Sequence, residues 1–100
     1  MKNFRTYQLA VEFYRLCLKL PLTGDARNQL SRASRSIVLN LAEGRGKRTT
    51  ADQKRFFYIA LGSTRECQAL MELEELNETT AGVTADKIGA SVYKLIQNAR

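Results

Sequence analysis

The sequence predicts an all-α fold, an antiparallel up-down-up-down four-helix bundle, on three observations. Apolar residues recur at steps of three and four along four segments, about 4–20, 26–43, 50–76 and 85–99, and this spacing is the helical period. No stretch alternates apolar and polar residues, which is the pattern of a half-buried strand. The connections between the segments are short, so neighbouring helices should be antiparallel.

The first helix is expected over residues 4–20. Its main apolar stripe, widened by Ala10 and Cys17, is Phe4, Tyr7, Val11, Tyr14 and Leu18. Pro21 ends the helix because proline cannot donate the next backbone hydrogen bond. Four further apolar residues lie off the stripe: Leu9, Phe13, Leu16 and Leu20. A single bundle buries one face of each helix, so this excess favours a subunit interface over a merely apolar surface.

The second helix is expected over residues 26–43. Asp25 is a suitable N-cap because its carboxylate can accept from the unpaired amides of the first turn. The apolar stripe of this helix is Leu30, Ala33, Ile37 and Leu41. Gly44 should end the helix, since glycine takes the left-handed C-terminal conformation without steric cost. Residues 45–48 would then form a loop.

The third helix is expected over residues 50–76, capped by Thr49 or Thr50. One face of it carries Phe56, Ala60, Ser63, Cys67 and Leu70. Residues 77–83 are polar and contain Gly82, so they are expected to form a loop. Thr84 would cap the fourth helix, residues 85–99, whose inner face is Ile88, Val92, Leu95 and Ala99.

The composition indicates one globular domain, residues 1–100, with 44% hydrophobic and 26% charged residues. No uncharged run approaches the roughly 20 residues that span a bilayer, and the first residues lack the apolar centre of a signal peptide. Cys17 and Cys67 lie far apart within apolar patterns, as core thiols do in a reducing compartment. A cytoplasmic protein is therefore expected.

Enzymatic activity, metals and cofactors are not expected. The chain has no His, the commonest general base and metal ligand. The acidic cluster Glu72, Glu74, Glu75 and Glu78 has no second ligand-bearing helix to face it, so a solvated surface is preferred over a metal site. The segment 44–49 resembles a phosphate loop only superficially, because a helix precedes it and one residue separates its glycines.

Positive charge gathers in the middle of the chain. The net charge is +6, and residues 1–60 contain twelve Lys/Arg against four Asp/Glu, while residues 61–100 contain four against six. The eight cations concerned are Arg27, Arg32, Arg35, Arg45, Lys47, Arg48, Lys54 and Arg55. Aromatic residues that could stack on bases are scarce, with Tyr58 the best candidate. The pattern thus indicates binding to a phosphate backbone without base reading, with a plain solvated surface as the alternative.

Small and polar residues form a second stripe beside the apolar stripe of the second helix. They include Ser36, Asn40 and Glu43, and the third helix offers Ser63 and Glu66. Small residues let helices approach closely, and a buried amide or carboxylate needs hydrogen-bond partners. We interpret these five residues as a network in the core or at a subunit interface, with a ligand site as the alternative.

Several segments together resemble a known family. They are Arg32-Ala33-Ser34-Arg35-Ser36-Ile37, Asn40-Leu41-Ala42-Glu43-Gly44, and the later set Phe56 or Phe57, Ala60, Gly62-Ser63 and Glu66, together with Tyr7, Ala10 and Pro21. In these residues the chain resembles the 23S rRNA-intervening sequence proteins, also called four helix bundle proteins. The resemblance implies a bundle protomer in a ring-like homopentamer without enzymatic activity. It also implies kinship to the accessory variability proteins of diversity-generating retroelements, which bind a reverse transcriptase and its RNA.

The leading hypothesis is a basic homo-oligomer, most simply a pentamer, that binds RNA or structured nucleic acid as a nucleoprotein scaffold. The alternative is a protein–protein adaptor that docks an acidic partner such as a reverse transcriptase and does not contact nucleic acid. Neither a membrane nor a small-molecule substrate is expected as a partner, because the cationic segments lack an exposed aromatic-leucine helix face and no polar pocket motif is present.

Overall fold

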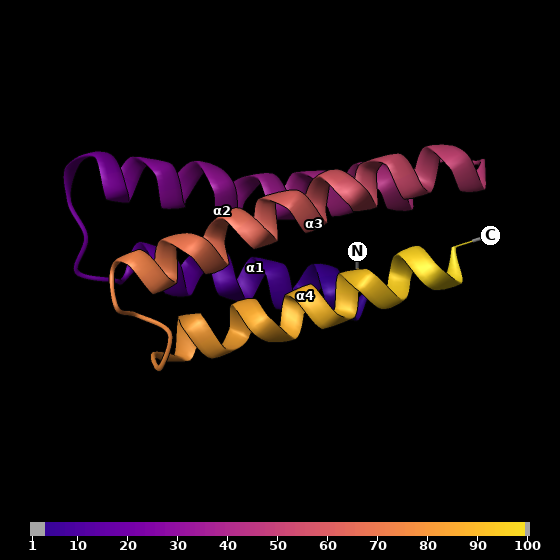
Figure 1. Ribbon diagram of the computed structural model, residues 1–100. Helices are drawn as coiled ribbons and strands as arrows, with labels where there is room; N and C mark the ends of the chain where they lie inside the picture. The colour runs from indigo at the N-terminus through magenta and orange to yellow at the C-terminus, as the bar shows by residue number, and fades with distance from the viewer. Residues whose placement is uncertain (1–3, 100) are drawn as a thin grey trace.

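The computed structural model describes residues 4–99 and forms four helices, with no strand in that range. The helices are α1 (Arg5–Leu18), α2 (Gly24–Arg45), α3 (Thr50–Leu73) and α4 (Thr80–Asn98), shown in Figure 1. They lie side by side in a body that measures 40 × 23 × 21 Å. The prediction of an all-α, four-helix fold is confirmed.

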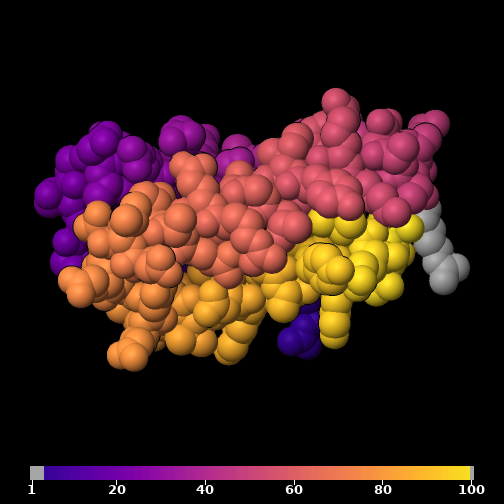
Figure 2. Space-filling model, in the orientation of Figure 1, coloured from indigo at the N-terminus to yellow at the C-terminus, as the bar shows by residue number. Residues whose placement is uncertain are grey.

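Each helix packs against two others. Helices α1 and α3 both contact α2 and α4, and no Cα atom of α1 lies within 8 Å of a Cα atom of α3. The α1–α2 and α3–α4 connections lie at one end of the bundle, and the α2–α3 connection lies at the other end (Figure 1). Helices α3 and α4 cover most of the face seen in Figure 2, with part of α2 above them. The two ends of the bundle therefore carry different connections.

The inward face of α1 differs from the predicted stripe. Its buried residues are Thr6, Ala10, Phe13 and Cys17. Phe13, expected off the stripe, is fully buried at 0% exposure, whereas Leu18 of the predicted stripe is 45% exposed. Leu9, Leu16 and Leu20 are half-buried and pack against the core. The predicted excess of outward apolar residues was thus largely wrong, because neighbouring helices cover both flanks of α1.

The other three helices bury most of the residues expected. All four members of the α2 stripe are buried, namely Leu30, Ala33, Ile37 and Leu41. In α3 the core face is turned slightly, so that Phe57 and Thr64 are buried and Phe56 and Ser63 are half-buried. In α4, Ile88 and Val92 are buried as expected, while Ile96 replaces Leu95 and Ala99. One hydrophobic cluster thus draws on all four helices.

Helix α4 begins earlier than its sequence suggests. Its N-cap is Thr79, whose Oγ1 accepts from the amide of Gly82 at 3.1 Å. Thr84, the predicted cap, lies inside the helix and donates to the carbonyl of Thr80 at 2.7 Å. Gly82 permits the early start, because a Cβ there would lie 2.5 Å from the carbonyl oxygen of Asn77. The expected loop over residues 77–83 was therefore too long.

Gly44 does not end α2, which continues to Arg45 with Gly46 as C-cap. It is buried in the contact with α3, where an added Cβ would lie 2.6 Å from Cε1 of Phe57. The glycine therefore serves close helix approach and not a turn.

Three other ends also shift. Thr23 rather than Asp25 is the N-cap of α2, α1 ends at Leu18 and α3 ends at Leu73. The predicted cap of α3 is confirmed, since Oγ1 of Thr49 accepts from the amide of Asp52. No helix among residues 4–99 is long and apolar enough to cross a membrane.

Candidate nucleic-acid interface

Five of the predicted cations gather where α2 passes into α3. Arg45 ends α2, Lys47 and Arg48 lie in the connection, and Lys54 and Arg55 lie in the first two turns of α3. We call these five residues the basic end. Arg45, Arg48 and Arg55 are exposed, and the two lysines are half-exposed. This grouping follows from the short α2–α3 connection, so the sequence could predict it.

Aromatic rings hold three of these cations in place. The guanidinium of Arg45 lies 4.6 Å from the ring centre of Phe4. On the other side, Nζ of Lys47 and the guanidinium of Arg55 lie 5.1 and 4.7 Å from the ring centre of Phe56. Each contact is a cation–π interaction that restrains a long side chain and leaves its positive charge at the surface.

The local balance of charge at the basic end is positive. The nearby carboxylates in sequence are Glu43 and Asp52, and Glu43 pairs with Lys47 at 3.6 Å. The N-terminus of α3 also lies here, and its unpaired amides and macrodipole add partial positive charge. The basic end is thus an electrostatically favourable surface for a polyanion.

Arg27 lies apart from the basic end. It is in the first turn of α2, at the opposite end of the bundle, and its guanidinium donates to the main-chain carbonyls at the end of α1 and beyond. The acceptors are the oxygens of Leu22 at 3.1 Å, Cys17 at 3.2 Å, Leu18 at 3.0 Å and Leu20 at 2.6 Å. Arg27 therefore stabilises the end of α1 by donating to main-chain carbonyls there. Only the tertiary structure reveals this role.

Arg32 and Arg35 occupy the outer side of α2, between the two ends. Arg32 pairs with Glu66 of α3 at 3.4 Å, with both side chains well exposed to solvent. No hydrogen bond or ion pair engages Arg35 within residues 4–99. The eight predicted cations therefore do not form a single patch.

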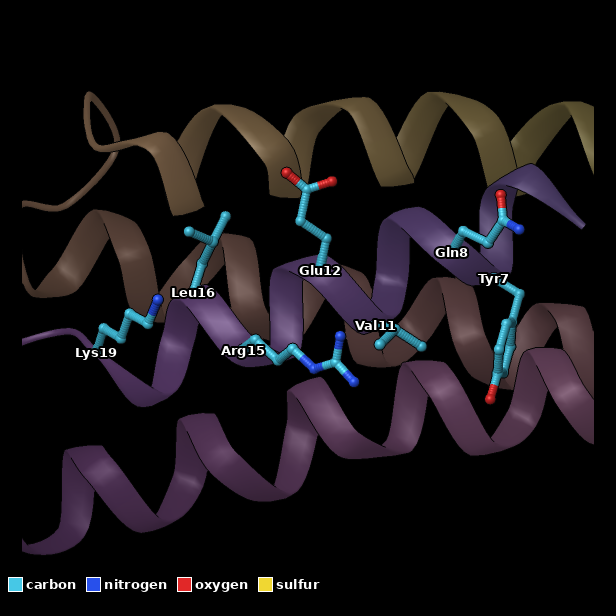
Figure 3. Close-up of a pocket in the computed structure, with 7 residues that line it drawn as sticks. All are labelled: Tyr7, Gln8, Val11, Glu12, Arg15, Leu16 and Lys19. Carbon is cyan, nitrogen blue, oxygen red and sulfur yellow. The ribbon is translucent and has the colours of Figure 1, made fainter. Parts of the chain in front are cut away.

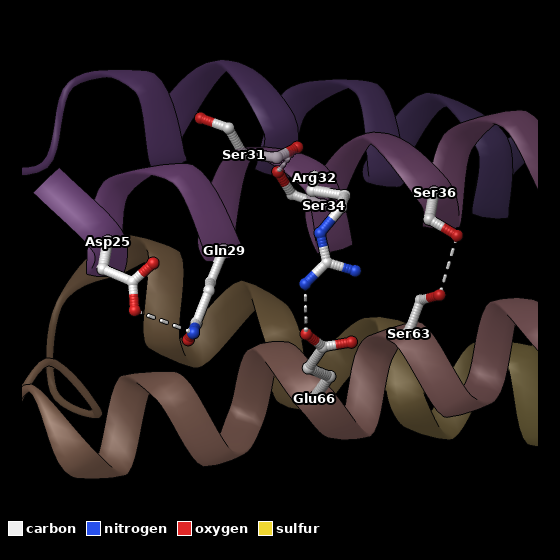
Figure 4. A network of polar contacts seen from close by, with 8 residues as sticks. All are labelled: Asp25, Gln29, Ser31, Arg32, Ser34, Ser36, Ser63 and Glu66. Carbon is white, nitrogen blue, oxygen red and sulfur yellow. Dashed lines mark hydrogen bonds and ion pairs between the residues drawn. The ribbon is translucent and has the colours of Figure 1, made fainter.

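Part of the predicted polar stripe lies between α2 and α3, where Figure 4 shows Ser36 and Ser63 facing each other. The hydroxyls of Ser36 and Ser63 are 2.8 Å apart, and Nδ2 of Asn40 donates to the carbonyl and the hydroxyl of Ser36 at 2.9 and 3.1 Å. Glu43 and Glu66 lie outside this network, exposed and paired with cations. No buried side-chain polar atom in the described part of the chain lacks a partner, so the network fixes the register of α2 against α3.

Negative charge collects at the opposite end of the molecule. The exposed carboxylates there are Glu72, Glu74, Glu75 and Glu78, around the α3–α4 connection. No group of acidic or thiol side chains in residues 4–99 could hold a metal ion. The charge asymmetry of the sequence is therefore an asymmetry along the long axis of the bundle.

The two cysteines are core residues. Burial raises the pKa of the Cys17 thiol to about 12, and it raises the pKa of the Cys67 thiol further still. Both thiols are free. A disulfide needs Cα atoms within about 7 Å, a separation that the placement of Cys17 on α1 and Cys67 on α3 exceeds. The neutral, buried thiols are therefore poor nucleophiles.

Surface hollows lie along α1. One of about 450 Å³ is lined by residues of α1, among them Tyr7, Glu12 and Arg15, and by its C-cap Lys19 (Figure 3). In Figure 3, Glu12 and Tyr7 point to opposite sides of the helix, so the lining does not converge on one point. Two further hollows lie between α1 and α2 and contain Tyr14 and Arg35. Sequence periodicity had placed Tyr14 in the core and gave no sign of them.

The fold and its surface define a class: a small helical-bundle protein whose polar residues form a charge-polarised exterior. The chain belongs to the 23S rRNA-intervening sequence protein family, whose model matches residues 4–98. Comparison with curated proteins found no match. The resemblance seen in the sequence is thus confirmed over nearly the whole chain.

Proposed function

We propose that the protein binds RNA through its basic end, without enzymatic activity, as a homo-oligomeric scaffold. The observation that carries the proposal is the group of five cations at the α2–α3 connection, three of them restrained by aromatic rings. Because the opposite end of the bundle is acidic, the basic end is the one that attracts phosphate. Lys and Arg contacts to phosphates gain affinity by releasing counterions. Such contacts carry no sequence information, so this binding does not read bases.

Salt dependence gives the proposal a quantitative form. Each phosphate neutralised contributes a slope of about −0.9 to the logarithm of affinity against the logarithm of salt for a duplex. Five contacts would give a slope of about −4 to −5 per protomer. Several protomers on one RNA would steepen it, because their contacts act together.

The proposed arrangement includes an up-down-up-down topology for the bundle, which two sets of contacts support. Contacts between α2 and α3 run in opposite order along the two helices, from Arg32–Glu66 through Ser36–Ser63. The α1–α2 contacts do the same, from Phe4–Arg45 to Cys17–Arg27. In a ring of parallel protomers all basic ends would face one side, which would concentrate the phosphate contacts there.

Assembly is supported by the outer face of α3. Tyr58 and Leu73 are 58% and 75% exposed, and Ile59 is also exposed. Between them lies Gly62, where an added Cβ would meet nothing within 4 Å. A glycine within a helix costs about 0.5–1 kcal/mol relative to alanine, and nothing within the protomer requires this one. Close approach of another protomer would explain it.

A matched pair of charge reversals tests RNA binding. Arg45→Glu, Lys47→Glu and Arg48→Glu together should lower the affinity for a duplex RNA hairpin at least about 100-fold at low salt, because phosphate contacts become repulsions. The control, Lys19→Glu, Lys87→Glu and Lys94→Glu, makes the same change in net charge at exposed positions elsewhere. It should retain most of the affinity, and circular dichroism should show both variants folded.

Two results would overturn the proposal: wild-type protein that does not bind the hairpin at low salt, or equal losses in both triple variants. A protein partner that copurifies and stays bound after nuclease treatment, with no RNA binding by the pure chain, would favour the adaptor.

A further inference from the structure

The outer surface between α1 and α2 contains a groove. A hollow of about 500 Å³ follows α2 and is closed on one side by Tyr14 of α1. A second hollow of about 370 Å³ shares Tyr14, Arg35 and Leu39 with the first and extends toward Val11 and Val38. We call the two together the α1–α2 groove. Their volumes fall within the range of about 300–1,000 Å³ typical of ligand sites.

The groove is cationic. Arg15, Arg32 and Arg35 line it, and no Asp or Glu is among its lining residues. In the described part of the chain, Arg15 and Arg35 have no ion pair, and Arg32 has only the long, exposed contact with Glu66. An exposed pair of this kind contributes little stability, so a phosphate can take its place. An anionic ligand is therefore favoured.

The remaining lining suits a heterocyclic base. Tyr14 is half-buried and contributes an aromatic ring to the lining that it shares with Arg35 and Leu39. Asn28 and Ser31 add an amide and a hydroxyl at the groove edge. Bases stack on aromatic rings and on guanidinium planes, and amides bond to base edges. An acidic protein helix could pair with the arginines of the groove. It has no planar edge of donors and acceptors for the Asn28 amide and the Ser31 hydroxyl to bond.

We propose that the α1–α2 groove binds a nucleotide of single-stranded nucleic acid, with its base against Tyr14 and its phosphates near Arg32 and Arg35. The inference rests on the proposed binding of RNA and adds a second mode, distinct from duplex binding at the basic end. Arg35 and Arg45 are ten residues apart on α2, or about 15 Å. A strand leaving a duplex at the basic end can therefore reach the groove.

A fluorescent reporter tests occupancy directly. The chain contains no Trp, so Tyr14→Trp places a single indole in the groove. An unstructured oligouridine of ten nucleotides should quench its emission at low salt through base stacking, whereas Tyr93→Trp, at an exposed site on α4, should not respond. Unchanged Tyr14→Trp emission at oligouridine concentrations that saturate binding would overturn the inference.

Affinity measurements separate stacking from charge. Tyr14→Leu keeps an apolar side chain and should weaken oligouridine binding about 5- to 100-fold, while Tyr14→Phe keeps the ring and should bind like wild type. Both should bind the duplex hairpin normally. Equal oligouridine affinity of Tyr14→Leu and wild type would overturn the inference and leave duplex binding at the basic end untouched.

Two other outcomes separate the groove from the other proposals. If emission of Tyr14→Trp shifts to the blue as protein concentration rises without RNA, a second copy covers the groove and the inference fails. If oligouridine binding depends on Tyr14 while both triple charge variants bind the hairpin equally, the groove is confirmed and the proposed role of the basic end fails.

Discussion

At the scale of single residues, the same side-chain type takes different roles according to what surrounds it. Arg27, Arg35 and Arg45 are all arginines of α2. The first donates to four main-chain carbonyls, the second has no ion pair in residues 4–99, and the third lies over the ring of Phe4. A count of cations along the sequence treats them alike, but only the latter two remain available to an external phosphate.

Arg27→Ala should destabilise the fold by about 2–3 kcal/mol, because it removes hydrogen bonds from a charged donor and leaves carbonyls at the end of α1 without partners. Urea unfolding followed by circular dichroism measures the change. Arg27→Lys should recover only part of the loss, since an ammonium cannot reproduce the planar fork of the guanidinium. Wild-type stability of Arg27→Ala would show that these bonds are of no consequence to the fold.

At the scale of the helices, two glycines show that a sequence pattern does not by itself give the role of a residue. Gly44 closes the segment Asn40–Gly44 and resembles a helix stop, yet α2 continues past it to Arg45. Its missing Cβ allows α3 to approach through Phe56 and Phe57. Gly62 is the reverse case, since the protomer itself places nothing near it.

Gly44→Ala should lower stability by about 1–3 kcal/mol, because the added methyl group overlaps the Phe57 ring and this strain exceeds the gain in helix propensity. Gly62→Ala, measured at concentrations low enough for isolated protomers, should instead raise stability by about 0.5–1 kcal/mol. Thermal unfolding of the two variants and of wild type measures both changes in stability, a loss for Gly44→Ala and a gain for Gly62→Ala. A stabilising Gly44→Ala would contradict the close α2–α3 contact.

At the scale of the whole molecule, the bundle is polarised from end to end. Basic side chains surround the α2–α3 connection and carboxylates surround the α3–α4 connection, at opposite ends of a body 40 Å long. Head-to-tail stacking and ring formation are both compatible with such a charge pattern. The exposed apolar residues of α3, Tyr58, Ile59 and Leu73, distinguish between these two arrangements. Tyr58 and Ile59 lie in the middle part of α3, on the side of the bundle and not at its ends, so the proposed assembly is a lateral one.

Assembly through α3 gives a prediction in solution. Wild-type protein should sediment well above its protomer mass of 11.3 kDa at micromolar concentrations. Gly62→Trp should sediment as a protomer with an unchanged helical spectrum, because the indole blocks close approach on the outer face. Ala90→Trp, at an exposed site on α4, is the matched control and should assemble normally. A wild-type protein of protomer mass would end the scaffold proposal.

Much of this protein was determined by its sequence alone. The period of apolar residues predicted four helices, and the short connection after Arg45 placed five cations together whatever the packing. The face that α1 turns inward was decided only by tertiary structure, because Tyr7, Val11 and Tyr14 repeat with the same period as Thr6, Ala10, Phe13 and Cys17. The spacing of apolar residues predicts that a helix has an apolar side. Packing against the neighbouring helices determines which side is buried.

The same limit applies to the candidate sites. The hydrogen bonds from Arg27 to carbonyls at and after the end of α1, and the groove that Tyr14 and Arg35 line from two helices, depend on how α1 packs against α2. Such contacts join residues through the packing of side chains on separate helices, and no local pattern in the chain encodes that geometry.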